Sequence, residues 1–145
     1  MKLVDLNILI YATDDTSAHH HRARTWLDRA ISSSETIGIP TAVATGYVRL
    51  TTSPRIMHQP LDVHTSIGVV RDWYRRPNVT APEPTARHFD LIEELLGSIG
   101  TAGNLVPDAH LAALAIEHGA ELYTFDRDFN RFSGLRCLEP EETCK

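Results

Sequence analysis

Four aspartates stand at positions where a parallel α/β sheet would place its chemistry. Asp5 follows a short apolar run, Asp108 lies in the first turn of an expected helix, and Asp126 and Asp128 follow a strand-like segment. Strand ends and helix starts meet at one edge of such a sheet. Carboxylates gathered there repel one another unless a divalent cation offsets their charge. The sequence therefore predicts an acidic metal site.

Each of these aspartates also has an ordinary structural interpretation. Asp5 is a good N-cap for a following helix, and the positive end of its own helix would stabilise Asp108. Asp126 and Asp128 could form a solvated turn. The shared placement of Asp5, Asp108 and Asp126 favours the metal centre. Oxygen ligands favour Mg²⁺ or Mn²⁺ over zinc. Such an ion suits phosphoryl-group chemistry, because it activates water and stabilises charge on a phosphate.

Length and composition predict one globular domain. The 145 residues are 42% apolar, the formal net charge is -5, and the two cysteines stand near the C-terminus. So few cysteines form no disulfide framework and fit a reducing cytoplasm. No signal peptide is visible, and no apolar run approaches the ~20 residues of a membrane helix. The acidic charge argues against binding nucleic acid by charge alone, so a nucleic-acid enzyme would need a local basic surface or bridging metal ions.

Strands alternate with helices along most of the chain, which predicts a three-layer α/β/α domain with a mostly parallel sheet. Strands are expected before Asp5 and at residues 36–39, 122–125 and 135–138, with an extended segment at 77–84. Helices are expected at residues 17–31, 41–52, 62–75, 85–99 and 107–118, with a short one after Asp5. In the helix at 85–99 we expect Phe89 to face the core. The domain should span residues 1–138, followed by a polar tail over 139–145.

Three histidines in a row, His19 to His21, open the helix expected at 17–31. Neighbouring side chains on a helix point about 100° apart, so one helix cannot direct all three at a single metal ion. We interpret this run as a solvated helix start rather than as a metal site.

Several segments, taken in order, resemble the PIN-domain nucleases. The opening residues 1–11, the segment GNLVPDAHLAALA at 103–115 and the segment LYTFDRDF at 122–129 carry this resemblance. With YVRLTTSPR at 47–55 added, the chain most resembles the VapC toxin family of toxin–antitoxin pairs, particularly its actinobacterial branch. The resemblance covers nearly the whole chain, and it rests on the ordered set because no single motif is specific.

The resemblance implies a three-layer PIN-like fold and a toxin that acts as an endoribonuclease with Mg²⁺, for which Mn²⁺ could substitute. Metal-bound water would attack the phosphodiester and release a 3′-hydroxyl and a 5′-phosphate. The resemblance also implies structured RNA substrates such as tRNA or ribosomal RNA. It implies a homodimer and a VapB-type antitoxin that blocks the site.

Matching residue by residue gives the expected site. Asp5, Asp108 and Asp126 match the catalytic metal ligands, and Asp128 matches a further ligand position. Two polar residues, Asn7 and Thr124, match positions that could orient those carboxylates. Arginine offers phosphate a bidentate fork, so the candidates for RNA contacts are Arg49, Arg55, Arg127 and Arg131. Scattered surface charge explains each of these arginines equally well.

One departure from the family pattern affects the expected activity. Many PIN nucleases carry a glutamate in the helix after the second strand, a few residues before an aromatic-x-Arg element. Here residues 41–47 contain no acid, and Ala44 matches the missing glutamate best. One fewer ligand should weaken metal binding or leave another water on the ion, although Asp126 or Asp128 could compensate.

Two other functions compete with the ribonuclease. A catalytically weak protein that binds RNA or an antitoxin would explain the missing glutamate, but the intact aspartates argue against it. A phosphatase with an aspartyl nucleophile also begins with a strand followed by Asp. Its usual second aspartate, two residues later, is Asn7 here, and no Thr/Ser-then-Lys sequence completes the pattern.

Overall fold

The computed structural model describes residues 1–100 and 102–142. Thr101, in the expected glycine-bearing loop, and residues 143–145 of the expected tail, with Cys144, lie outside the described residues. The helices are α1 (Leu6–Thr13), α2 (His20–Ile31), α3 (Thr41–Thr51), α4 (Val63–Arg75), α5 (His88–Ile99) and α6 (Val106–Glu117). The strands are β1 (Lys2–Val4), β2 (Ile37–Gly38), β3 (Val79–Thr80), β4 (Glu121–Tyr123) and β5 (Cys137–Leu138). Two 3-10 turns, η1 (Gly103–Leu105) and η2 (Arg127–Arg131), complete the list.

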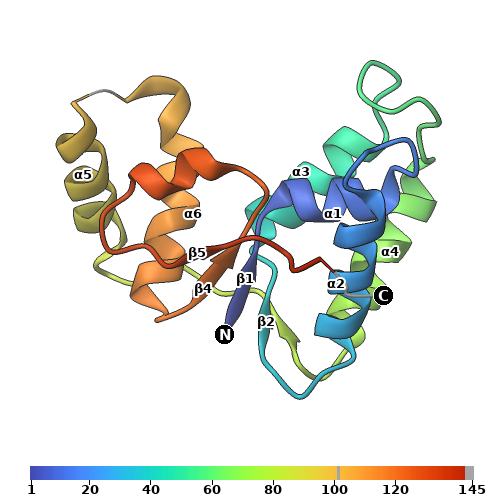
Figure 1. Ribbon diagram of the computed structural model, residues 1–145, viewed down its shortest axis with the longest axis horizontal. Helices are drawn as coiled ribbons and strands as arrows, with labels where there is room; N and C mark the ends of the chain where they lie inside the picture. Colours follow the sequence, from blue (N-terminus) through green and yellow to red (C-terminus); the bar gives the residue numbers. More distant parts are fainter. Residues whose placement is uncertain (101, 143–145) are drawn as a thin grey trace.

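The five strands form one sheet in the order β3-β2-β1-β4-β5, and every neighbouring pair is parallel. Strand β1 lies in the middle, between β2 and β4 (Figure 1). All five strands therefore end at the same edge, which is where Asp5 leaves β1. The predicted α/β fold with a parallel sheet is confirmed.

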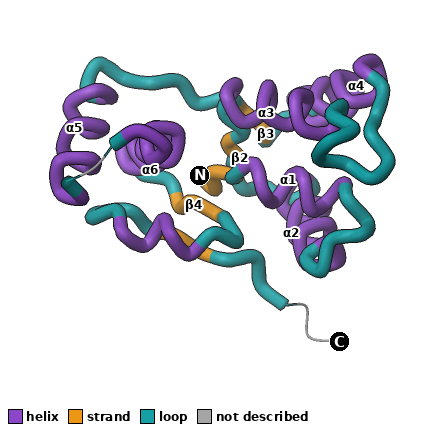
Figure 2. The backbone as a smooth tube through the Cα atoms, turned by 90° about the horizontal axis from the view of Figure 1, so that it is seen from above, coloured by secondary structure: helices purple, strands orange, loops and turns teal. Residues whose placement is uncertain are grey.

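The helices lie on two sides of this sheet. Helices α1 to α4 gather on one side of the strands, and α5 and α6 lie on the other (Figures 1 and 2). This follows from the right-handed crossover of parallel strands, because the chain steps outward from β1 to β3 and then returns past β1 to β4. The result is the predicted three-layer arrangement. None of the described helices is long and apolar enough to cross a bilayer.

The middle of the sheet is buried on both faces. Leu3, Val4 and Leu122 are fully buried, as expected for apolar strands of a parallel sheet. Gly38 lets β2 pack closely, because a Cβ there would lie 2.9 Å from Leu3 Cδ1 and 3.2 Å from Pro82 Cγ. The rigid centre of the sheet therefore fixes where Asp5 emerges.

Two helices begin three residues later than the sequence predicts, and one apolar residue faces outward. The hydroxyls of Ser17 and Thr85 accept hydrogen bonds from backbone N–H groups two residues ahead, and these turns delay α2 and α5. The expectation for Phe89 is wrong: this side chain is 80% exposed. The buried face of α5 instead runs through His88, Leu91 and Leu95.

Candidate active site

Asp5 caps helix α1 and is held on both carboxylate oxygens. Its Oδ1 accepts a hydrogen bond from the backbone N–H of Leu6 at 2.7 Å, and its Oδ2 accepts one from the Thr124 hydroxyl at 2.6 Å. The backbone N–H of Asp5 donates to the Tyr123 carbonyl at 3.0 Å. The capping interpretation is therefore confirmed, and the same contacts hold the carboxylate at the edge of the sheet between β1 and β4.

Thr124 is the buried centre of this arrangement, with only 1% of its surface exposed. Besides donating to Asp5, its hydroxyl accepts from Nδ2 of Asn7 at 3.0 Å and from the backbone N–H of Asp126 at 2.9 Å. The other end of the Asn7 amide accepts from the backbone N–H of Phe125 at 3.3 Å. These bonds tie the start of α1 to the residues that follow β4.

The aspartates influence one another electrostatically. Burial raises the pKa of Asp5 to about 6, with added repulsion from Asp108 and Asp126 and opposition from the hydrogen bonds of Thr124 and Leu6. Burial also raises the pKa of Asp108, and repulsion from Asp126 and Asp128 acts in the same direction, whereas Arg131 opposes it. The four aspartates therefore share one acidic region.

The four aspartates do not converge on one point. Asp126 caps η2 by accepting from the backbone N–H of Asp128 at 2.9 Å, and Asp128 itself is exposed. Over residues 1–100 and 102–142, no three acidic, histidine or cysteine side chains lie close enough together to hold a metal ion. The four aspartates thus line an acidic edge of the sheet and do not surround a metal ion on all sides.

The four arginines fall into two pairs. Arg131 lies beside the acidic region, with Nε donating to the Asp128 carbonyl at 2.8 Å and Nη2 3.2 Å from its carboxylate. Arg127, four residues earlier, pairs with Glu139 at 3.0 Å. Arg49 is exposed in the last turn of α3, and Arg55 is exposed in the turn beyond it. Among the described contacts of these arginines, it is Arg131 that reaches one of the four aspartates.

The helix that lacks an acid approaches the site through Gly46. Ala44, matched to the missing glutamate, is buried with 5% of its surface exposed. A Cβ at Gly46 would lie 2.8 Å from Cδ2 of Leu6, the residue after Asp5. A side chain at Gly46 would therefore displace the end of the Leu6 side chain, in the first turn of α1.

An aromatic cluster beside the acidic region was not expected from the sequence. The ring of His19 stacks on Phe125 with centroids 4.6 Å apart, and Tyr11 meets the edge of Phe125 at 5.6 Å. The Arg22 guanidinium lies 5.2 Å from the same ring. His19 and His21 are exposed, as expected for a solvated helix start, and one face of the His19 ring packs on the residue before Asp126. Only the folded chain brings these distant residues together, so no local pattern could have identified the cluster.

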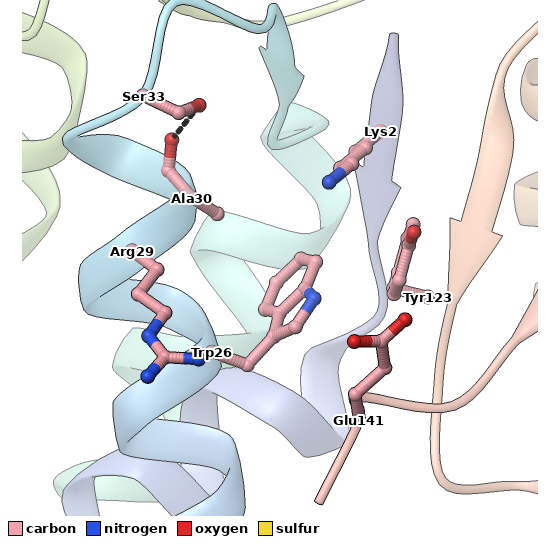
Figure 3. Close-up of a pocket in the computed structure, with 7 residues that line it drawn as sticks. All are labelled: Lys2, Trp26, Arg29, Ala30, Ser33, Tyr123 and Glu141. Atoms are coloured by element: carbon pink, nitrogen blue, oxygen red, sulfur yellow. Dashed lines mark hydrogen bonds between the residues drawn. The ribbon is translucent and has the colours of Figure 1, made fainter. Parts of the chain in front are cut away.

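A separate hollow of about 220 Å³ opens between α2 and the sheet. Trp26 lies 4.6 Å from Tyr123 between ring centroids, and Lys2, Tyr123 and Glu141 lie across the hollow from α2 (Figure 3). None of the four aspartates lines it. This hollow therefore does not belong to the acidic region.

Comparison with known proteins identifies the family. The model of the PIN domain family matches residues 2–135. Ribonuclease VapC37 of Mycobacterium tuberculosis is 42% identical over 140 residues, which cover 97% of each chain. This chain belongs to the VapC family of PIN-domain proteins. Ribonuclease VapC33 of the same organism is 36% identical and covers 97% of this chain and 98% of its own.

Solved structures of VapC proteins share the fold of this VapC-family chain. VapBC2 from Rickettsia felis, bound to a DNA fragment from their promoter, matches with a TM-score of 0.68 at 20% identity, covering 97% of this chain and 98% of the other. VapC20 of Mycobacterium tuberculosis, described as a Sarcin-Ricin loop cleaving toxin, matches with a TM-score of 0.63 at 19% identity, covering 94% and 99%. The predicted family is confirmed, and its ribonuclease members support the same class of activity for this chain.

Proposed function

We propose that this VapC-family chain is the toxin of a toxin–antitoxin pair and a Mg²⁺-dependent endoribonuclease that cleaves structured RNA. One observation carries the proposal. Asp5 is a carboxylate whose pKa burial raises to about 6, yet Thr124 and the start of α1 hold it in place beside Asp108 and Asp126. A fold that keeps so costly a group in one geometry supports a cation and an anionic substrate at that edge.

The candidate ligands are of the chemical type that Mg²⁺ binds. They are all carboxylate oxygens, and Mg²⁺ in proteins commonly takes one or two carboxylates, several waters and the phosphates of a substrate. This suits an edge where no three acidic side chains of the described residues converge. Asp5 and Asp108 would hold the ion, with Asp126 and Asp128 adding negative charge. When bound, Mg²⁺ supplies a Lewis acid that activates water and stabilises charge on the phosphate.

The protein's own groups would position the reaction. Thr124 and Asn7 restrict the rotation of Asp5, so that the carboxylate is already oriented when substrate arrives. Arg131 now contacts the Asp128 carboxylate through one nitrogen only, and an RNA phosphate would offer its guanidinium a bidentate contact instead. The neighbouring stack of His19 on Phe125 offers a flat surface to an unpaired base.

Cleavage of total cellular RNA by the purified protein tests this function. With Mg²⁺ or Mn²⁺ we expect a few discrete products, with 5′-phosphate and 3′-hydroxyl ends at a defined site, and none with EDTA. Products that persist in EDTA would refute the metal requirement. A folded protein that binds RNA or its antitoxin but cuts no RNA under any metal condition would support the second candidate, a binding protein, which the open arrangement of ligands favours.

Adding an acid at Gly46 should strengthen the metal site. The Gly46→Glu side chain displaces only the flexible end of Leu6 and reaches toward the start of α1. We expect the Mg²⁺ concentration for half-maximal cleavage to fall about three- to tenfold, because a further carboxylate joins the acidic edge. Gly97→Glu on α5 is the matched control, since a Cβ there meets nothing within 4 Å. An unchanged Mg²⁺ requirement in Gly46→Glu would place the missing ligand elsewhere.

A VapB-type antitoxin is the proposed partner. A groove of about 380 Å³ lies between α1, α2 and α4, and its walls include Leu27, Val69 and Trp73. An amphipathic segment of an antitoxin fits such a surface. Its arginine or lysine side chains could then neutralise the acidic edge. We expect the neighbouring antitoxin gene product to copurify and to suppress cleavage, and Val69→Asp to weaken copurification without affecting cleavage.

A second copy of the chain is also proposed as a partner. The exposed ring of Phe89 on α5 is the kind of aromatic anchor enriched at protein interfaces. Sedimentation equilibrium should give twice the mass of one chain. A single-chain mass at concentrations where cleavage occurs would contradict the homodimer.

A further inference from the structure

A buried chain of hydrogen bonds joins α5 to α6 outside the acidic region. Oε1 of Glu117 lies 2.8 Å from Nδ1 of His88, and Nε2 of His88 lies 2.8 Å from Nδ1 of His110. The Thr85 hydroxyl donates to the other Glu117 oxygen at 2.9 Å. Because the His88 and Glu117 side chains are 3% and 1% exposed, their mutual contacts must satisfy them. These hydrogen bonds therefore fix the orientation of the His110 ring.

One nitrogen of His110 remains for a ligand. A carboxylate only accepts, so Nδ1 of His88 donates to Glu117, and Nε2 of His88 shares a single proton with Nδ1 of His110. In the part of the chain that the structure describes, Nε2 of His110 has no protein partner and is not a buried unsatisfied atom. It is thus an oriented hydrogen-bonding atom that faces outward.

His110 lines a cavity of about 330 Å³ at the edge of the sheet where the strands end. One wall is the start of α3, and another is the segment 82–84 that follows β3. The lining residues are Pro40, Thr41, Ala42, Pro82, Glu83, Pro84, His110 and Leu114. His118 Nε2 bonds the Glu83 carbonyl at 2.6 Å, which anchors the proline wall to α6. Asp108 lies two residues before His110 on α6, so the two side chains point about 200° apart, and none of the four aspartates lines this cavity.

The chemistry of this lining favours a flat, neutral ligand over a phosphate. Three proline rings and Leu114 supply the apolar surface, and Thr41, Glu83 and His110 supply polar groups. None of the described lining residues is Lys or Arg, and the Glu83 carboxylate would repel a phosphate. Ligand pockets commonly combine apolar walls with a few fixed polar atoms. Sequence-specific RNA recognition uses splayed bases that stack on flat side chains and hydrogen-bond along their edges.

We propose that this cavity is a nucleobase subsite for the RNA substrate, in which one base of the bound strand packs on the proline wall and hydrogen-bonds to Nε2 of His110. The inference rests on the proposed ribonuclease function and adds a specificity-determining residue to it. Glu117 and His88 act through His110 as positioning residues, because they lie behind it and do not face the cavity. Asp108 and His110 stand on different faces of α6, so the subsite would hold a base away from the bond that is cleaved.

Two variants test the subsite from opposite directions. His110→Ala removes the contact atom, whereas Ala42→Trp fills the cavity from an exposed position without touching the buried chain. His64→Ala, on an exposed face of α4, is the control. The probes are fluorescent RNA oligonucleotides that span the mapped cut site, with single abasic nucleotides placed along them. Binding is measured on proteins that also carry Asp5→Asn, which prevents cleavage, and thermal unfolding verifies each fold.

We expect His110→Ala and Ala42→Trp to weaken binding about tenfold, roughly the effect of losing one stacked base. At one position, an abasic nucleotide should weaken binding to the wild-type protein by about the same factor. The same nucleotide should not weaken binding to the His110→Ala protein any further. Folded variants that bind like His64→Ala, or abasic losses that are equal in both proteins at every position, would overturn the subsite while leaving cleavage intact. If the wild-type protein neither binds nor cuts any RNA, the proposed function and the subsite fail together.

Discussion

Asp5→Asn should abolish RNA cleavage and yet make the metal-free protein more stable. Removing the charge should lower the cleavage rate about 10³-fold or more, because the acidic edge loses its best-held carboxylate. Ionising Asp5 in the fold at pH 7 costs about 3 kcal/mol, given a pKa raised to about 6. Asparagine avoids that cost but pairs less well with Thr124, so we expect a net gain of about 1–2 kcal/mol in the free energy of unfolding.

The pH dependence of this gain follows from the direction of the pKa shift. The folded protein holds the Asp5 proton more tightly than the unfolded chain does, so ionisation removes stability as pH rises from about 4 to about 6. The asparagine variant does not lose stability in this way. The stability difference between the two proteins should therefore widen across this window and stay constant above it.

Urea unfolding at several pH values measures this difference, and Asp15→Asn in an exposed turn is the matched control. A variant that cleaves RNA at the wild-type rate would exclude Asp5 from the reaction. If metal-free Asp5→Asn were less stable than the wild-type protein at pH 7, the Asp5 charge would not destabilise the fold.

Thr124→Val should damage both the fold and the reaction. Valine keeps the shape but removes the hydroxyl that donates to Asp5 and accepts from Asn7 and Asp126. Each buried group left without a partner costs about 1–3 kcal/mol, so we expect a total loss of about 3 kcal/mol and a fall in Tm of roughly 10 °C. The rate should fall about 10- to 100-fold, because Asp5 is no longer held in one orientation.

Thr124→Ser is the rescue variant, since it restores the hydroxyl. Thr52→Val is the control, because within the described residues the Thr52 hydroxyl bonds to nearby backbone carbonyls of α3 alone. Thermal unfolding and single-turnover cleavage measure the two effects. If Thr124→Val kept the wild-type rate after its lower stability was offset by a lower temperature, the proposed orienting role would be refuted.

Local patterns in the sequence were enough to predict the sheet and the edge where Asp5 lies. A buried apolar strand followed by Asp5 requires the carboxylate to leave at the strand end, and the structure places it there. Phe89 was misplaced because the buried face of α5 runs through His88, Leu91 and Leu95, and apolar spacing does not reveal a face that includes a buried histidine. The position of Gly46 against Leu6 depends on how α3 crosses α1, which is a tertiary property.

The hydrogen bonds that link Glu117, His88 and His110 could not be predicted from the sequence for a related reason. His88 and His110 stand on different helices, and nothing near either residue in the sequence indicates that they meet. Buried polar networks of this kind are selected by three-dimensional packing, so they become visible only when α5 lies against α6. The acidic residues, in contrast, follow directly from strand ends and helix starts.

Thermal unfolding with and without Mg²⁺ is the most direct test of the central claim, that the edge around Asp5 is a divalent-cation centre. A ligand that binds only the folded state raises its stability, and here it also relieves the repulsion among Asp5, Asp108 and Asp126. We predict that Mg²⁺ and Mn²⁺ raise the Tm of the wild-type protein, and that Asp5→Asn starts higher and does not respond. A wild-type Tm that neither ion changes would contradict this claim. An equal rise in the Tm of Asp5→Asn would contradict it as well.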